Sequence, residues 1–335
     1  MKAVTNALPK DLKGAIAAAA QARANGQSSA FAGGGSDILG QMKDRVVSPD
    51  VLVYLKSVKG LDAVTSDAKQ TTIGGLITLD ALAHHQAVRS RYAALAMAAE
   101  TVATPQIRNV ATLAGNVCQR PWCWYYRNGF PCLKNGGNRC FSIDGENQHH
   151  AIFGGGPSYI VHPSDTAPAL MAFDASFRVT GPAGERSVAA SEFFVLPKDD
   201  AKRENVLKDD EVLSGVVLPS ATSNIRSTYF KVMDREAWTH AIVSVAVVMT
   251  MEGDNQTCRD ARVVLGGVAP IPWRVPEAEK ALKGQRLTRE LAAKAGAVAI
   301  QGARPLAKNA YKIPMLENAV ARAVIEAGQL PPISV

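Results

Sequence analysis

Apolar positions divide the first third of the chain into short strands that alternate with helices. Runs of β-branched and aromatic residues predict strands, and alanine-rich segments with a helical period predict helices. The predicted strands are 28–32, 51–55 and 71–79, and the predicted helices are 38–43, 79–87 and 93–103. The Gly74-Gly75 pair indicates a tight bend within its strand.

The pattern changes at residue 118. Residues 118–157 are rich in Cys, Gly, Asn, Arg and aromatic side chains and follow neither the strand period nor the helix period. Irregular segments longer than about 15 residues inside a domain are usually functional or disordered. We expect regular structure to return with a strand at 159–162, a helix at 168–172 and a strand at 177–180.

A third pattern begins after a polar, proline-containing boundary at 219–224. Strands are predicted at 228–232, 241–251 and 261–268, with a turn at 252–255 between the second and the third, which is typical of an antiparallel meander. Helices are predicted at 276–282, 288–301 and 314–327. The sequence therefore predicts an α+β fold with a domain at 1–220, divided into subdomains of about 1–56 and 57–220, and a second domain at 221–335.

Composition excludes several classes of protein. The chain has 335 residues, 47% hydrophobic and 20% charged, with a net charge of +7. Lys and Arg are spread along the chain, so no nucleic-acid partner is expected. No run of about 18 apolar residues predicts a membrane span. The N-terminal segment has no apolar core typical of a signal peptide. We expect a cytoplasmic protein, or a periplasmic one exported together with a partner.

A glycine-rich loop follows the first predicted strand. It consists of Ala32, Gly33, Gly34, Gly35, Ser36 and Asp37. Glycines let a backbone approach an anion closely, and the following helix N-terminus favours negative charge. The spacing fits neither a Rossmann fingerprint nor a P-loop. A simple tight turn is the alternative interpretation.

A second loop carries polar groups that suit a nucleotide. Thr112 offers a hydroxyl, Ala114 and Gly115 are small, Asn116 offers an amide, and Arg108 lies just before them. Such groups can hydrogen-bond a pyrophosphate or the edge of a flavin ring.

Cysteines are concentrated in the irregular segment. Cys118, Cys123, Cys132 and Cys140 are separated by four, eight and seven residues, whereas Cys258 stands apart as an expected buried apolar residue. Four thiolates suit zinc or an iron–sulfur cluster. The lack of a C-x-x-C pair argues against a zinc ribbon, and a chain with a large core has little need of disulfides.

Two further groups of polar and aromatic side chains are candidates for binding a cofactor or a partner. His149 and His150 close the cysteine segment, where hydrogen bonding is favoured over metal ligation. Arg235, Trp238 and His240 precede a predicted strand and could face a flavin or a partner, although ordinary packing is favoured. No convincing Ser/His/Asp or Cys/His catalytic set is present.

Together, the two loops resemble those of the flavin-binding subunits of the xanthine dehydrogenase and CO dehydrogenase family. Further markers are His162-Pro163-Ser164-Asp165 and the run from Leu265 to Pro270 before Pro272-Trp273-Arg274. The resemblance implies a two-subdomain PCMH-type FAD-binding domain followed by a C-terminal domain with a three-stranded antiparallel sheet and helices. It implies non-covalent FAD, with residues 32–37 around the pyrophosphate, 112–116 as a second wall and Asp165 near the flavin.

The cysteine segment resembles that of a subset of these subunits, including aldehyde oxidoreductases of the PaoABC type, which carry an inserted [4Fe–4S] cluster. In some of those relatives the fourth ligand follows a His-Ala-Ile run, but residues 154–161 contain no cysteine here. Cys118 is the natural substitute, so the expected ligands are Cys118, Cys123, Cys132 and Cys140.

The resemblance implies an electron relay. A large subunit with a molybdenum cofactor would oxidise an aldehyde or an N-heterocycle, and a small subunit with two [2Fe–2S] clusters would pass electrons to this flavin. A self-sufficient flavin oxidase and a non-enzymatic metal-binding scaffold stay open as alternatives. The first usually tethers its flavin covalently, and the second would contain no stoichiometric flavin.

Overall fold

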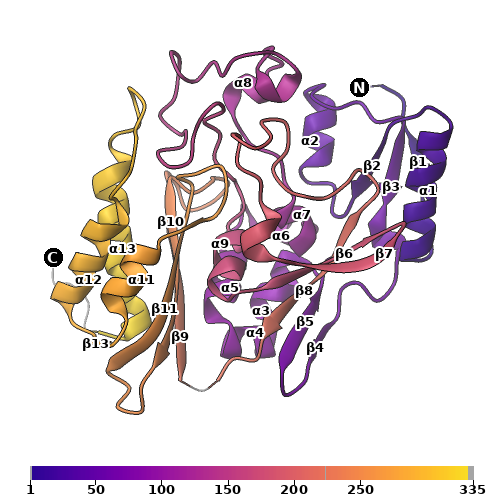
Figure 1. Ribbon diagram of the computed structural model, residues 1–335. Coiled ribbons are helices and arrows are strands. Elements are labelled where there is room, and N and C mark those ends of the chain that lie inside the picture. The colour runs from indigo at the N-terminus through magenta and orange to yellow at the C-terminus, as the bar shows by residue number, and fades with distance from the viewer. Residues whose placement is uncertain (1, 223, 331–335) are drawn as a thin grey trace.

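The computed structural model describes residues 2–222 and 224–330, and within them the strands form three sheets (Figure 1). The first is parallel, with the order β1-β3-β2, and packs against α1. Asp11 caps α1 by accepting a hydrogen bond from Gly14 N. The elements of this part are β1 (Thr5–Ala7), α1 (Leu12–Ala24), β2 (Ser29–Ala32), α2 (Ile38–Lys43) and β3 (Val51–Tyr54).

The second sheet is antiparallel, with the order β4-β5-β8-β6-β7, and is accompanied by short helices. Its strands are β4 (Val64–Ser66), β5 (Gln70–Gly74), β6 (Ser176–Gly181), β7 (Gly184–Ala189) and β8 (Val212–Pro219). Its helices are α3 (Leu79–His84), α4 (Gln86–Arg91), α5 (Ala93–Glu100), α6 (Pro105–Arg108), α7 (Leu113–Val117), α9 (Thr166–Ala172) and α10 (Ala190–Phe193). The irregular segment 118–157 contains α8 (Trp124–Arg127) and the short 3-10 helix Leu133–Asn135.

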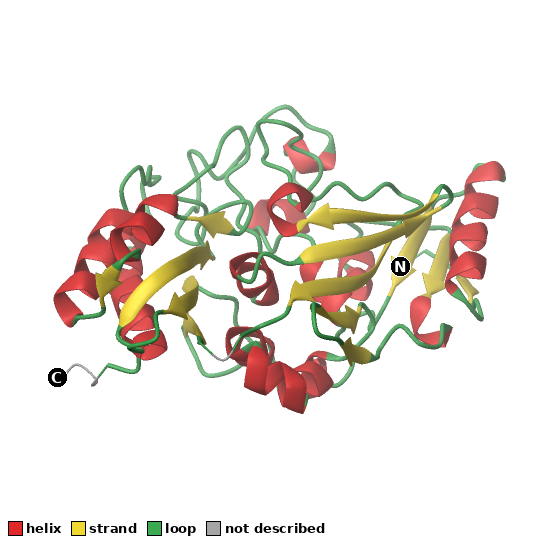
Figure 2. Cartoon of the chain, turned by 60° about the horizontal axis from the view of Figure 1, so that its bottom comes forward, coloured by secondary structure: helices red, strands yellow, loops and turns green. Residues whose placement is uncertain are grey.

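The third sheet has the order β12-β11-β10-β9, with β13 also paired to β11. Figure 2 shows helices packed along this sheet at the C-terminal end of the molecule. Its strands are β9 (Ile225–Val232), β10 (Val243–Met251), β11 (Thr257–Gly266), β12 (Trp273–Arg274) and β13 (Gln285–Arg286), and its helices are α11 (Pro276–Leu282), α12 (Arg289–Ala299) and α13 (Lys312–Gly328).

The almost uniformly apolar strand β10 is explained by burial of both its faces. Val245, Val247 and Met249 pack in the core formed with α11, α12 and α13. Ala246 and Val248 point the other way, into the core that also contains side chains of α5 and α9. Alternating side chains of one strand therefore join the C-terminal domain to the preceding one.

The α+β fold class and the antiparallel C-terminal meander are confirmed, but the strand predicted at 159–162 is wrong. Tyr159 O accepts a hydrogen bond from Ala151 N, whereas His162 N donates to Ala269 O, both at 2.9 Å. Two different partners bind this extended stretch, so no ladder forms. Among the described residues, no helix combines the length and apolar character needed to cross a membrane.

Candidate flavin site

The two glycine-rich loops lie against each other at the junction of the first two sheets. A Cβ atom added to Gly34 would lie 1.9 Å from the Val110 carbonyl oxygen, and one added to Gly33 would lie 2.7 Å from Thr112 Oγ1. Gly35 has φ +78°, a left-handed conformation that glycine adopts readily. The glycines therefore let two backbones pack at a distance that no side chain would allow.

The second loop is organised by two polar side chains. Thr112 caps α7, because its Oγ1 accepts a hydrogen bond from Gly115 N at 3.1 Å. The buried Asn116 Oδ1 accepts from Ser164 Oγ at 2.6 Å and from Thr166 Oγ1 at 2.7 Å. Asn116 thus fixes this loop to the start of α9.

Asp165 belongs to a buried ion pair. Its Oδ2 lies 2.8 Å from Lys231 Nζ, and its Oδ1 accepts a hydrogen bond from the Tyr229 hydroxyl at 2.7 Å. Lys231 also donates to the carbonyl oxygens of Thr101 and Thr239. Burial, together with the charge of Asp165, raises the pKa of Tyr229 well above its ordinary value. The carboxylate is therefore held between the two domains.

Two adjoining cavities open beside these loops. The smaller one, about 230 Å³, contains Ser36, Asp37, Gly115, Asn116 and Asp165 in its wall. The larger one, about 440 Å³, lies between the cysteine segment and the C-terminal domain. Both are bounded by Trp122, Pro163, Asp165, Thr239 and His240.

The other predicted cofactor residues lie behind the cavity wall. Ala32, Thr112 and Ala114 are buried, and Gly33 packs against the second loop. Arg108 turns away and donates to Val102 O at 2.9 Å.

Arg235, Trp238 and His240 line the smaller cavity, which agrees with the alternative that this patch faces a flavin. Residues 235–240 follow the strand that carries Lys231, and that connection was the signal that could have placed them at the site.

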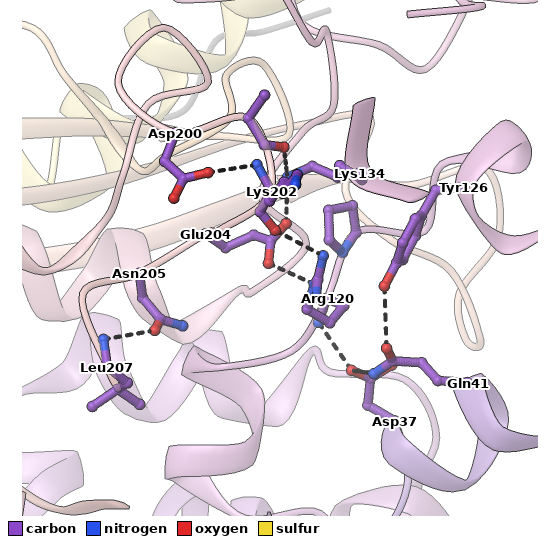
Figure 3. Close-up of polar contacts among 12 residues, drawn as sticks. Asp37, Gln41, Arg120, Tyr126, Lys134, Asp200, Lys202, Glu204, Asn205 and Leu207 are labelled. Carbon is purple, nitrogen blue, oxygen red and sulfur yellow. Dashed lines mark hydrogen bonds and ion pairs between the residues drawn. The ribbon is translucent and has the colours of Figure 1, made fainter. Parts of the chain in front are cut away.

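Asp37 connects the first loop to the cysteine segment. Its carboxylate accepts hydrogen bonds from Arg127 Nη2 at 2.7 Å, from Arg120 N at 2.9 Å and from Gln41 Nε2 at 2.9 Å. Figure 3 shows Asp37 and Gln41 beside Arg120 and Tyr126. Although Asp37 lines the cavity, these contacts already occupy both of its oxygens.

A buried carboxylate anchors the same segment from a second direction. Glu204 Oε1 lies 2.5 Å from Lys134 Nζ, and Glu204 Oε2 lies 2.6 Å from Arg120 Nε. All three side chains are shown in Figure 3. Burial lowers the pKa of Lys134, and the charge of Glu204 opposes that shift.

The C-terminal domain holds the other end of the segment. Lys312 is buried, and its ammonium donates to the carbonyl oxygens of His149, His150 and Gly267 at 2.8–3.2 Å. Burial lowers the pKa of Lys312 to about 7. Asn309 Nδ2 donates to His150 O at 3.0 Å.

Burial raises the pKa of two of the four cysteines in the segment. Cys118 ends α7 and packs against the core of the second sheet, and burial alone raises its pKa to about 12. Burial also raises the pKa of Cys123 to about 11, and the charges of Cys140 and Cys132 act in the same direction. Cys123 Sγ lies 3.4 Å from His150 Nε2.

Within the part of the chain that the structure describes, the segment does not gather a metal-ligand set. Across residues 2–222 and 224–330, no group of three or more Cys, His, Asp or Glu side chains is placed to hold a metal ion. Cys258, by contrast, is fully buried in β11, as its strand position predicted.

Comparison with known proteins agrees with this geometry. A family model for the FAD binding domain in molybdopterin dehydrogenase matches residues 4–221, and one for the CO dehydrogenase flavoprotein C-terminal domain matches residues 228–327. The chain is 33% identical to the aldehyde oxidoreductase FAD-binding subunit PaoB of Escherichia coli K12 over 303 residues, which cover 89% of this chain and 91% of that protein.

Relatives with other substrates are also similar. The carbon monoxide dehydrogenase medium chain of Hydrogenophaga pseudoflava is 26% identical, with 94% of each chain covered. A chain in a solved structure of carbon monoxide dehydrogenase from that organism has a TM-score of 0.76 at 24% identity, with 98% of each chain covered. The protein therefore belongs to the FAD-binding subunits of the xanthine dehydrogenase and CO dehydrogenase family.

Proposed function

We propose that this chain receives electrons from the [2Fe–2S] clusters of a small partner subunit and passes them through FAD to an external acceptor. A large partner subunit with a molybdenum cofactor would oxidise an aldehyde or an N-heterocycle. Family membership supports this proposal. The similar proteins named aldehyde oxidoreductase, carbon monoxide dehydrogenase and nicotine 6-hydroxylase are FAD-binding or medium subunits of oxidoreductases.

The observation that carries the flavin assignment is the contact of Gly34 with Val110. Because these backbones touch, the two loops form one continuous cradle beside the smaller cavity. Backbone N–H groups of glycine-rich loops suit a pyrophosphate. Bound FAD would supply a centre that takes up electrons singly and releases them in pairs.

The buried pair of Asp165 and Lys231 would add no net charge beside the flavin. Asp165 lies in the wall shared by both cavities, and Lys231 neutralises it. Asn116 keeps the second loop and the 162–165 segment together, so the polar edge of the site is rigid before any ligand binds.

Gly34→Ala tests the flavin proposal. The new methyl group would force the loops apart, and we expect the purified chain to lose most of its FAD. Gly40→Ala is a matched control, because Gly40 lies in the adjacent helix α2 and a Cβ atom there meets nothing within 4 Å. Equal FAD content in both variants, measured by absorbance and by release on acid precipitation, would contradict the proposal.

We also propose that Cys123, Cys132 and Cys140 bind an iron–sulfur cluster of the [4Fe–4S] type. Thiolates are the usual ligands of such clusters. All three lie in the irregular segment 118–157, and cluster binding would have to draw them together into one ligand set. Cys118, predicted as the fourth ligand, instead packs against the core of the second sheet.

Measuring the iron content of single-cysteine variants tests which cysteines bind the cluster. After anaerobic isolation, Cys123→Ser should lower iron per chain and the broad absorbance near 400 nm. Cys118→Ser should retain both. Wild-type protein that contains flavin but neither iron nor zinc would exclude the cluster while leaving the flavin assignment intact.

A further inference from the structure

We propose that Trp122 forms one wall of the flavin site, where its indole stacks on the isoalloxazine ring, and that Arg127 and Asp37 position it. This inference rests on the proposed flavin function. It assigns a contact to a residue in the irregular segment, outside the two glycine-rich loops.

Trp122 occupies the boundary between the two cavities and lines both of them. Its side chain is 46% exposed, although the adjoining Pro121 is buried. A large aromatic residue that leaves nearly half of its surface free at a cavity wall has a face available for a ligand.

Two groups contact the indole and hold it in place. The guanidinium carbon of Arg127 lies 4.2 Å from the ring centroid, within the range of a cation–π contact. The ring of His240, which comes from the C-terminal domain, lies 5.6 Å away. Trp122 is therefore placed by contacts to two different parts of the chain.

Arg127 is itself immobilised. Its side chain is 6% exposed, its Nε donates to Pro121 O at 2.9 Å, and its Nη2 donates to Asp37 Oδ1 at 2.7 Å and to Arg120 O at 3.0 Å. Asp37 lies at the end of the glycine-rich loop. It thus acts as a positioning residue, because its carboxylate fixes the arginine beneath the indole.

The lining of the smaller cavity suits a flat aromatic ring that has polar groups on one edge. Apolar side chains line one part of it, and polar groups lie at its edge. The apolar residues are Val102, Ala103, Ile107 and Ala111, and the polar ones include Asn116, Gln119 and Thr239. The isoalloxazine has carbonyl and N–H groups on one edge and an electron-poor ring system that pairs well with an electron-rich indole.

The full-length chain loaded with FAD provides a direct test. A stacked indole quenches flavin fluorescence by electron transfer to the excited ring. We therefore expect Trp122→Leu, which keeps the site apolar, to brighten bound-flavin emission several-fold and to raise the Kd for FAD about tenfold. Asp37→Asn should shift both quantities in the same direction by a smaller factor.

Trp124→Leu is the matched control, because Trp124 lies in the same segment, is 64% exposed and lines only the larger cavity. It should leave emission and Kd unchanged. Circular dichroism checks that each variant is folded.

Three results would overturn the inference. The first is unchanged flavin emission in Trp122→Leu. The second is weaker FAD binding without brighter emission, which would place the adenine rather than the isoalloxazine at this wall. The third is an equal effect of Trp122→Leu and Trp124→Leu on emission and Kd. Wild-type protein without flavin would instead refute the proposed function itself.

Discussion

The ammonium of Lys231 lies 2.8 Å from Oδ2 of Asp165, and both side chains are almost completely buried. Lys231 comes from β9 of the C-terminal sheet, whereas Asp165 immediately precedes α9 of the preceding domain. The pair thus connects two domains at the wall shared by the two cavities. A buried pair of this kind stabilises little relative to apolar packing, but the loss of one partner leaves an uncompensated charge.

We therefore predict that Asp165→Asn destabilises the protein by about 3–5 kcal/mol. The double variant Asp165→Asn with Lys231→Met should recover part of that loss, because no isolated ammonium stays buried. Thermal unfolding followed by circular dichroism measures both effects. Glu185→Gln breaks the exposed pair with Arg178 and should change stability by no more than about 1 kcal/mol. A double variant as unstable as the sum of its singles would show that the two side chains act independently.

Lys312 supports a second prediction, about how the cysteine segment is held. Its three hydrogen bonds reach the His149–His150 turn and Gly267. Lys312→Met should remove about 2–3 kcal/mol of local stability, since three buried carbonyl groups lose their hydrogen-bond donor. We expect faster hydrogen exchange in residues 146–151, with little change in β9.

Lys308→Met provides the comparison for this prediction. Lys308 pairs with Glu146 of the same segment, but both side chains are about half exposed or more. Exposed pairs contribute little. Exchange in residues 146–151 that rises equally in both variants would show that the buried position of Lys312 has no special role.

Local apolar patterns in the sequence predicted much of the fold. The three long strands and three helices of the C-terminal domain follow from short-range apolar periodicity, and the structure contains them with shifted ends. The two-residue strands β12 and β13 were not predicted, because they are too short to show a period. The glycine-rich loop was recognisable because three consecutive glycines lie between a predicted strand and a predicted helix, although a tight turn would explain the same pattern. The reason for Gly34, however, is a contact with Val110, which lies far along the chain.

The site could not be completed from the sequence, because its polar groups pair across long separations. Asp37 looked like a cofactor residue, yet its partners Arg120 and Arg127 lie 83 and 90 positions away. Cys118 ends α7 and packs against the core, a contact that its spacing from the other cysteines does not show. A short-range sequence pattern does not show which of these distant side chains contact each other.

The buried histidines predict acid sensitivity. Burial lowers the pKa of His162 to about 3 and that of His150 to about 4. In the unfolded chain each imidazole takes up a proton near pH 6.5, whereas the folded protein keeps both neutral. Between these values the unfolded state binds more protons, so stability rises with pH and falls as the solution is acidified, by about 1.4 kcal/mol per pH unit for each histidine.

His162→Gln should therefore reduce the slope of the unfolding free energy against pH, between about pH 6 and 4, by the contribution of one histidine. This expectation holds even if the substitution also changes stability at neutral pH. Urea unfolding at several pH values measures the slope. His84→Gln changes an exposed histidine and should leave the slope as it is in the wild type. A His162→Gln slope identical to that of the wild type would mean that His162 is protonated in the folded protein, and that burial does not keep this imidazole neutral beside the larger cavity.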